Sequence, residues 1–226
     1  MSAETDLSPV LPSGLVPSLA EQTAARLRES ILSGEIGPGE RLSEARLAAT
    51  LAVSRNTLRE VFRLLTREGL LHHEPNRGVF VATPSMASIL DIFRVRRMIE
   101  VPALAQAWPR HEGIARMRTA VERAEALAGV ADWRAVGTEN IAFHNAIVAL
   151  TDSPRLIAFH RQIAVELRLT FGLLDSPEML HAPYIALNRE IVDRAGAGDT
   201  AGAAVLLGHY LDQSERTIMA AFARLA

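Results

Sequence analysis

Cysteine and lysine are both absent from this sequence of 226 residues. Without cysteine the chain can form no disulfide, no thiolate metal site and no cysteine nucleophile. All 24 basic residues are arginine, a complete bias that indicates genome composition more than selection at single positions. The sequence also lacks an apolar run long enough to span a membrane, and it does not begin with a basic segment followed by an apolar one. We therefore expect a cytoplasmic protein with no signal peptide and no membrane contact.

Charge and length set two further limits. The formal net charge is −2, so any contact with nucleic acid must come from a local basic patch rather than from the chain as a whole. Hydrophobic residues make up 49% of the chain and charged residues 22%, which is an ordinary globular composition. A chain of this length can bury one large core or two modest ones.

The first part of the chain predicts helices in close succession. Residues 1–17 are rich in serine and proline without periodicity, so we interpret them as a disordered arm. The capping box SLAE at Ser18–Glu21 opens a helix that should run to about residue 33, where a glycine-rich loop begins. Two short helices are then expected, over residues 43–51 and 54–68. Only two residues separate them, as in a helix-turn-helix.

A hairpin is expected directly after these helices. Two β-prone runs, Leu70–His73 and Val79–Ala82, surround a turn that contains Pro75, Asn76 and Gly78. Helix, helix-turn-helix and hairpin together describe a winged helix-turn-helix domain over residues 18–83.

Beyond Pro84 the pattern is purely helical. Helices of this length bury a core of their own, so residues 84–226 are predicted to form a second domain, an all-α six-helix bundle. The fold class is therefore mainly α, with a small β-hairpin wing. The six helices are expected at about residues 85–108, 112–128, 133–151, 154–174, 184–196 and 200–224.

The helix over residues 54–68 is the candidate for reading DNA. Ser54 is placed as its N-cap, and its buried stripe is predicted to be Leu58, Val61, Phe62 and Leu65. Arg55 and Arg59 flank this stripe near the amino end, the part of such a helix that enters a major groove. The alternative is that its arginines form a solvated face, paired with Glu60 and Glu68.

A longer pattern resembles the winged-helix domain of GntR-type bacterial transcription regulators. It runs from ILSGEIGPGERLSEARLAATLAVSRNTLRE to EGLLHHEPNRGVFVATPS. The resemblance implies that Arg55 and Arg59 contact the operator, supported by Ser54, Asn56 and Thr57, and that the wing Arg77–Gly78 enters the minor groove. A basic residue that some relatives use on the preceding helix is Ala45 here, with Arg46 beside it, which leaves that contact open.

The helical part resembles the FCD effector domain of the FadR subfamily, in its shorter, VanR-like branch. The motifs are RMIE at the end of Arg96–Glu100, NIAFH at Asn140–His144 and AGD with its following alanine at 197–203. Such domains hold a divalent metal with an aspartate and three histidines. By position, these ligands correspond here to Asn140, His144, Asn188 and Tyr210.

Only His144 among these four is a strong metal ligand. An amide oxygen and a phenol are poor substitutes for an imidazole. His209 points about 100° away from Tyr210 on its helix, and His181 falls in a predicted loop, so neither replaces a missing ligand. We expect no cofactor, and at most weak binding of a divalent metal through His144 and Asn140.

Arg96, His144, Asn188 and Tyr210 nevertheless lie on the inner faces of four helices, where polar groups must satisfy one another or a ligand. One interpretation is a set of separate hydrogen-bonded core residues. The other, which the resemblance favours, is an effector pocket. In it Arg96 binds a carboxylate, Arg168 is a weaker second cation, and Asn140, His144, Asn188 and Tyr210 orient the ligand.

The sequence therefore predicts a homodimeric repressor, released from a palindromic operator in double-stranded DNA by a small anionic metabolite. One alternative is a metal-dependent helical enzyme with His144 and Glu139 as acid–base groups, although no catalytic triad or glycine-flanked nucleophile is present. The other is an architectural DNA-binding protein without a ligand.

Overall fold

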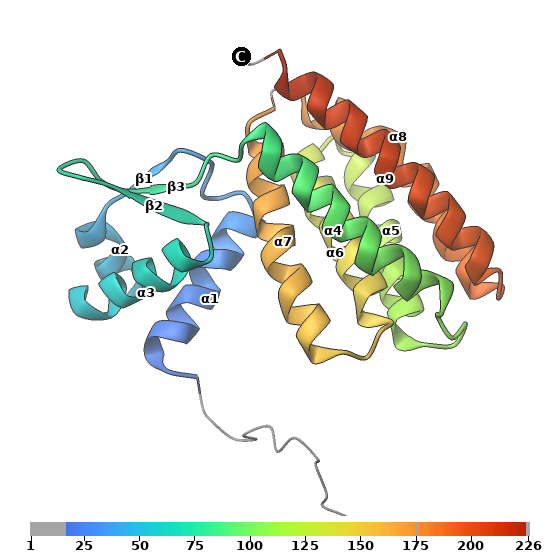
Figure 1. Ribbon diagram of the computed structural model, residues 1–226, viewed down its shortest axis with the longest axis horizontal. Coiled ribbons are helices and arrows are strands. Elements are labelled where there is room, and N and C mark those ends of the chain that lie inside the picture. Colours follow the sequence, from blue (N-terminus) through green and yellow to red (C-terminus); the bar gives the residue numbers. More distant parts are fainter. Residues whose placement is uncertain (1–16, 175, 225–226) are drawn as a thin grey trace, which may run out of the picture.

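The computed structural model describes residues 17–174 and 176–224 (Figure 1). The predicted arm falls almost entirely on residues 1–16, outside the described residues. The amino-terminal part contains a three-stranded sheet beside three helices. Its elements are α1 (Leu19–Leu32), β1 (Arg41–Leu42), α2 (Glu44–Leu51), α3 (Arg55–Arg67), β2 (Leu71–Glu74) and β3 (Gly78–Val81).

Serine caps begin all three of these helices, as the sequence predicted for two of them by name. Ser18 forms the complete capping box with Glu21, and the Ser54 hydroxyl accepts a hydrogen bond from the backbone N–H of Thr57 at 3.0 Å. Ala52 closes α2 in the left-handed region, with φ of 55°, so the chain reverses within the two-residue turn before α3. The helix-turn-helix is therefore confirmed.

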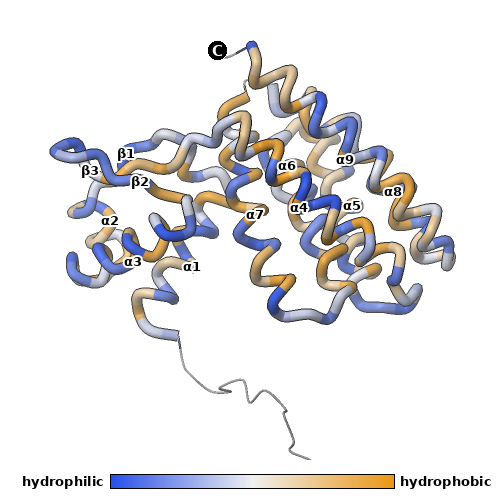
Figure 2. The backbone as a smooth tube through the Cα atoms, viewed as in Figure 1, coloured by the Kyte–Doolittle hydropathy of each residue, from blue (hydrophilic) through white to orange (hydrophobic). Residues whose placement is uncertain are grey.

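The sheet has one strand more than the predicted hairpin. Its order is β1-β3-β2, all antiparallel, with Leu71 opposite Val81 and Arg41 opposite Phe80. The strand β1 was not predicted because its two residues end a glycine-rich loop and are too short to show alternation. In Figure 2 the tip of the β2–β3 hairpin is hydrophilic, as expected for a solvent-exposed wing.

Six helices follow, and they pack around their own hydrophobic core. The central helix α6 contacts α4, α5, α7 and α8, while α9 packs across α4 and α8. No helix among the described residues is long and apolar enough to cross a membrane. The six are α4 (Met86–Ala105), α5 (Glu112–Ala128), α6 (Trp133–Ala149), α7 (Pro154–Gly172), α8 (Pro177–Gly196) and α9 (Thr200–Phe222).

The predicted start of α8 at residue 184 was wrong. The helix begins at Pro177, a position where proline costs no hydrogen bond, and it continues through Pro183. The inner face of this first part buries Leu180, His181 and Tyr184, which offsets the backbone hydrogen bond that Pro183 cannot make. His181 therefore lies on a helix and not in a loop.

The helix α7 joins the two parts of the molecule. It lies against α1, and its residues Val165 and Leu169 belong to the hydrophobic core of the winged helix. Other residues of α7, among them Ile163 and Leu167, belong to the core of the helical bundle. One rigid element thus contributes to both cores.

Candidate functional site

The amino end of α3 presents a polar surface. Arg55 and Asn56 are exposed, and Arg55 forms no ion pair with any described residue. Thr57 is half-buried, and its hydroxyl lies 2.8 Å from the Ser54 hydroxyl. Ser54 and Thr57 therefore stabilise the start of the helix, whereas Arg55 and Asn56 are available to a partner.

Other arginines predicted to contact DNA are held by carboxylates. Arg59 Nε donates to Glu44 Oε1 at 3.1 Å, and Arg46 lies 4.0 Å from Glu40. Arg77, at the wing tip beside Gly78, pairs with Glu74 and lies over the ring of Phe80. These pairs are exposed, so each is worth little and a phosphate can displace the carboxylate.

A groove of about 920 Å³ runs between α3 and the sheet. Three arginines from successive turns of α3 line one wall, and Gly78 of the wing lines the other. The lining arginines of α3 are Arg59, Arg63 and Arg67. The polar amino end of α3 thus lies on the same helix as a groove lined by arginines.

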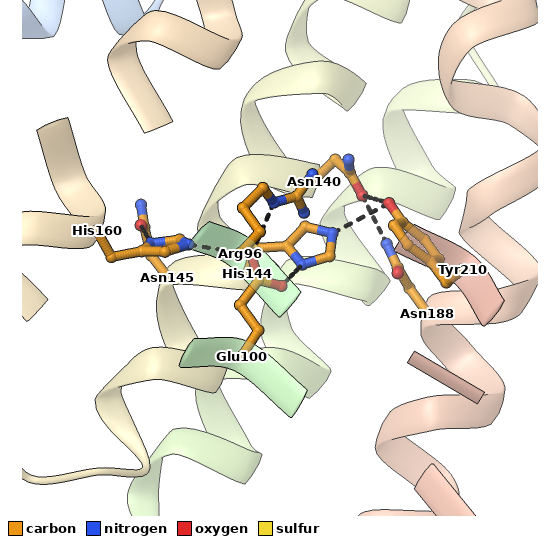
Figure 3. A network of polar contacts seen from close by, with 8 residues as sticks. All are labelled: Arg96, Glu100, Asn140, His144, Asn145, His160, Asn188 and Tyr210. Carbon is orange, nitrogen blue, oxygen red and sulfur yellow. Dashed lines mark hydrogen bonds and ion pairs between the residues drawn. The ribbon is translucent and has the colours of Figure 1, made fainter. Parts of the chain in front are cut away.

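A second polar cluster lies inside the helical bundle (Figure 3). At its centre Glu100, fully buried on α4, accepts three contacts. Arg96 Nε donates to Oε1 at 2.7 Å, His144 Nδ1 lies 2.7 Å from Oε2, and His160 Nε2 lies 3.1 Å from Oε1. His160 in turn lies 2.9 Å from Asn145 Oδ1.

The cluster continues from His144 towards α8 and α9. His144 Nε2 lies 3.1 Å from the hydroxyl of Tyr210, and that hydroxyl also lies 3.0 Å from Asn140 Oδ1. Asn188 Nδ2 donates to the same oxygen at 2.8 Å. The structure therefore brings together five of the six predicted effector residues. We call the whole cluster the central network, and Figure 3 draws its eight residues: Arg96, Glu100, Asn140, His144, Asn145, His160, Asn188 and Tyr210.

Charge in this central network is balanced internally. Burial alone would raise the pKa of Glu100, but the Arg96 guanidinium and the hydrogen bonds from His144 and His160 outweigh it and hold that pKa well below its ordinary range. Burial lowers the pKa of His144 to about 4, against the opposing effect of Glu100. Near neutral pH the network thus consists of an ionised Arg96–Glu100 pair and a neutral imidazole on His144.

The central network is closed rather than open to a ligand. Arg96, His144 and Tyr210 are each 2% exposed, and none of them lines the grooves and cavities identified among the described residues. Two buried atoms of the network have no hydrogen-bond partner among the described residues, Arg96 Nη2 and Asn188 Oδ1. One donor and one acceptor therefore remain available inside an otherwise satisfied cluster.

A divalent metal does not fit these residues. One imidazole, two amides and one phenol form a weak donor set, and His144 already uses both ring nitrogens. His209 is exposed on the outer face of α9. No group of three or more His, Asp or Glu within 17–174 and 176–224 is arranged to hold a metal ion.

The outer end of the central network reaches a surface groove between α5, α6 and α7. This groove has a volume of about 530 Å³, and Asn145 and His160 form part of its wall. Arg116, Arg123 and Arg161 also line it, together with Glu112 and Glu139. Glu139 is separated from the buried His144, which does not line the groove, so the two do not form an acid–base pair in one cleft.

Arg168, the sixth predicted effector residue, lies elsewhere. Its guanidinium donates to the backbone carbonyl oxygens of Arg134 at 3.3 Å and Ser33 at 3.2 Å, where α7 meets the end of α1. The sequence predicted Arg168 as a weaker second cation of the effector pocket, whereas the structure places its guanidinium at the junction with the winged helix. Periodicity along α7 does not say which neighbour a buried residue of that helix meets.

Three residues of the central network were not predicted. Glu100 stands four residues after Arg96, a spacing that places two charges of opposite sign on one helix face. This spacing could have predicted the ion pair. Asn145 and His160 gave no such signal, because their contact joins two helices whose relative position the sequence does not state.

Comparison with known proteins identifies both parts of the chain. The family described as "Bacterial regulatory proteins, gntR family" matches residues 19–81, and the family described as "FCD domain" matches residues 91–213. The second match alone covers more than half of the chain.

Individual relatives agree with this. A crystal structure of a GntR transcriptional regulator from Rhodococcus sp. RHA1 has 38% identity and a TM-score of 0.85, over 91% of this chain and 99% of its own. The Nta operon transcriptional regulator of Aminobacter aminovorans is 28% identical, over 70% of this chain and 76% of its own. The HTH-type transcriptional repressor RspR of Escherichia coli K12 is 30% identical, over 54% of this chain and 55% of its own.

Proposed function

Since the chain belongs to the gntR family of bacterial regulatory proteins and carries an FCD domain, it is a transcription regulator rather than an enzyme, and we propose that it represses its target genes until a small carboxylate releases it from a palindromic operator. The observation that supports this proposal most directly is the exposed amino end of α3, where Arg55 and Asn56 lie beside a basic groove.

Arg55 and Arg59 read base edges or hold phosphates in this proposal, while Ser54 and Thr57 fix the helix start and Asn56 adds a polar contact. Operator binding replaces Glu44 by DNA as the partner of Arg59. The wing, through Arg77 and Gly78, enters the minor groove, and Arg46 contacts the backbone.

In this proposal a homodimer provides the second winged helix that a palindromic operator requires. One winged helix covers a single half-site, so a palindrome needs a two-fold partner. We place this contact in the helical domain, so residues 84–226 should form a dimer without the winged helix. Sedimentation of that fragment at micromolar concentration checks the assignment, and a monomer would contradict it.

The effector is placed at the groove between α5, α6 and α7 and at the central network behind it. A carboxylate in the groove has Arg123 and Arg161 within its walls. Asn145 and His160 connect this groove to Glu100, and through it to Arg96, His144 and Tyr210. Arg96 Nη2 and Asn188 Oδ1 offer the remaining donor and acceptor if the network opens.

The helix α7 is the element through which binding would reach the DNA. It carries His160 at the groove, and five and nine residues further on it carries Val165 and Leu169 in the core of the winged helix. A ligand that draws His160 away from Glu100 shifts this helix and with it the spacing of the two recognition helices.

Selection of binding sites from random duplex DNA tests the DNA-binding proposal. We expect a palindrome with half-sites about one helical turn apart. Recovery of no enriched sequence would leave only general electrostatic binding and would refute operator recognition.

The effector proposal needs a separate experiment. A panel of small carboxylates is added to the full chain in a thermal-unfolding assay, because a ligand of the native state raises its stability. The hit should also release the selected DNA, and Arg123→Met should weaken both effects while Arg155→Met, an exposed position on α7, leaves both unchanged. A closed central network also suits a DNA-binding protein without a ligand, and a panel with no hit would favour that function.

A further inference from the structure

The junction between the winged helix and the helical bundle contains a buried positive charge that has no carboxylate partner among the described residues. The side chain of Arg168 is 7% exposed, and no described Asp or Glu lies within ion-pair distance of it. Its hydrogen bonds go to two backbone carbonyls, Ser33 at the end of α1 and Arg134 in the first turn of α6. A helix carboxyl end meets only part of a unit charge, so most of the charge of Arg168 is unmatched.

Glycines from two elements make the room for this guanidinium. A Cβ atom at residue 34 would lie 2.6 Å from Arg168 Nη2, and one at residue 137 would lie 2.8 Å from Arg168 Nη1. Gly34 also has φ of +77°, a conformation that other residues rarely adopt. The backbone therefore approaches the arginine more closely than any side chain would allow.

A second polar group converges on the same point from α8. His181 is 3% exposed, and its Nδ1 has no hydrogen-bond partner among the described residues. A Cβ atom at residue 137 would lie 2.6 Å from His181 Nε2, so this imidazole and the Arg168 guanidinium meet above one glycine. A buried unpartnered ring nitrogen beside a buried unpaired cation is costly unless something else binds there.

A cavity of about 230 Å³ is present at this place. Arg168 and His181 line it, and the exposed Arg134 lines it as well. The other described lining residues are glycine, proline or apolar, and none of these is acidic. The cavity is below the roughly 300–1,000 Å³ typical of drug-sized ligands, which limits the occupant to a small molecule or ion.

From these observations we propose that the cavity between the two domains is a binding site for a small oxyanion, held by the guanidinium of Arg168 and by Arg134, with the imidazole of His181 beside them. The shared chemistry is that of a carboxylate or a phosphate group, either of which accepts paired hydrogen bonds from arginine. The site is separate from the groove and from the central network.

Occupancy of this site has a structural consequence. Its walls come from both domains, Gly34 to Pro38 on one side and α6, α7 and α8 on the other. An anion bound there stabilises the present arrangement of the winged helix on the bundle, because it binds only when both walls are in place.

Titration of the full chain with sodium phosphate, and separately with sodium succinate, tests the proposal. Each is compared with sodium chloride at equal ionic strength, by calorimetry and by the thermal midpoint. We expect at least one of the two anions to bind and to raise the midpoint above the chloride control. A response to phosphate alone identifies a phosphate-bearing ligand, and a response to succinate alone identifies a carboxylate.

Variants assign the response to the site. Arg168→Met keeps an unbranched apolar stem and removes the guanidinium and its charge, so it should weaken anion binding at least ten-fold. Arg155→Met on the exposed part of α7 should leave anion binding unchanged. Gly137→Ala should also abolish binding, because its methyl group occupies the meeting point of the two side chains. Should Gly137→Ala fail to fold, the arginine variants still decide.

Three results would overturn the proposal. One is a wild-type chain that responds to neither anion, and another is an equal response from Arg168→Met. Asp175 lies outside the described residues, so Asp175→Asn is included. Anion binding that appears only in this variant would mean that Asp175 is the native partner of Arg168. None of these results bears on operator binding, which the site-selection experiment measures by itself.

Discussion

Among the described residues two arginines are almost fully buried, and their surroundings differ. Arg96 lies in the middle of the helical bundle and donates to Glu100, a carboxylate that two histidines also contact. Arg168 lies at the domain junction, and its partners are backbone carbonyls. A carboxylate therefore balances the charge of Arg96, whereas no described acidic residue balances the charge of Arg168.

Each arginine also has a buried histidine near it. Burial lowers the pKa of His144, near Arg96, and that of His181, near Arg168, to about 4 in both cases, but Glu100 opposes the effect only at His144. This difference indicates at which of the two arginines an incoming anion is bound more favourably. Near Arg96 it meets Glu100 of like charge, whereas at Arg168 it meets no acidic residue among the described residues of the cavity wall.

The largest effect is expected from removing the charge of Glu100. Glu100→Gln leaves Arg96 buried without a counter-charge, and breaking such a pair costs about 3–5 kcal/mol of unfolding free energy. Urea unfolding measures the loss. Glu215→Gln is the matched control, because its partner Arg97 is partly exposed and such pairs contribute about 1 kcal/mol or less. A loss no larger than that of the control would show that Arg96 is not held by Glu100.

The two buried histidines, His144 and His181, predict that the folded protein becomes less stable as the pH falls. Their pKa of about 4 in the folded chain is below the unfolded value near 6.5, so between these values the unfolded chain binds protons that the folded chain does not. Stability is therefore full above pH 6.5 and declines towards pH 4, by up to about 3 kcal/mol for each group. The groups facing His144 are Arg96, Glu100, His160 and Tyr210, and the charge acting on His181 is Arg168.

Urea midpoints at pH 7, 6 and 5 measure this decline. His181→Gln should remove about half of the slope, and phosphate or succinate bound beside Arg168 should reduce the same half, since an anion favours a protonated imidazole. Stability that stays level between pH 7 and 5 would contradict the assignment of two neutral buried imidazoles.

Arg55, exposed and unpaired with described residues, extends the comparison to the surface. Arg55→Ala should weaken binding to a selected operator by roughly 1–3 kcal/mol, the usual range for one base-reading arginine, and leave stability unchanged. Fluorescence anisotropy at constant salt measures it, with Arg155→Ala as the control. Equal losses in the two variants would mean that the arginines act as a general electrostatic field.

The amino-terminal part could be predicted almost entirely, because its signals are local. The capping box at Ser18, the two-residue turn around Ala52 and the buried stripe of α3 each depend on neighbours within a few residues. Helical periodicity also placed Asn140, His144 and Tyr210 on inner faces, and the structure joins them.

What could not be predicted depends on how helices pack. An inner face does not reveal which helix it meets, so no sequence pattern separates Arg168 from Arg96 or joins His160 with Glu100. The start of α8 was misplaced for a different reason. Two prolines within seven residues favour a loop, and only the burial of His181 and Tyr184 outweighs that preference.

The smallest effect on stability is expected from Arg168→Met, and it tests the comparison directly. In buffer without phosphate or carboxylate, the variant loses hydrogen bonds to the carbonyls of Ser33 and Arg134 but also loses an unmatched buried charge. The two changes oppose each other, so the unfolding free energy should change by less than about 1 kcal/mol, in contrast to Glu100→Gln. Urea unfolding of both variants in the same buffer gives the comparison. A loss for Arg168→Met as large as that for Glu100→Gln would mean that the charge at the junction is neutralised within the protein, and the two buried arginines would then be equivalent.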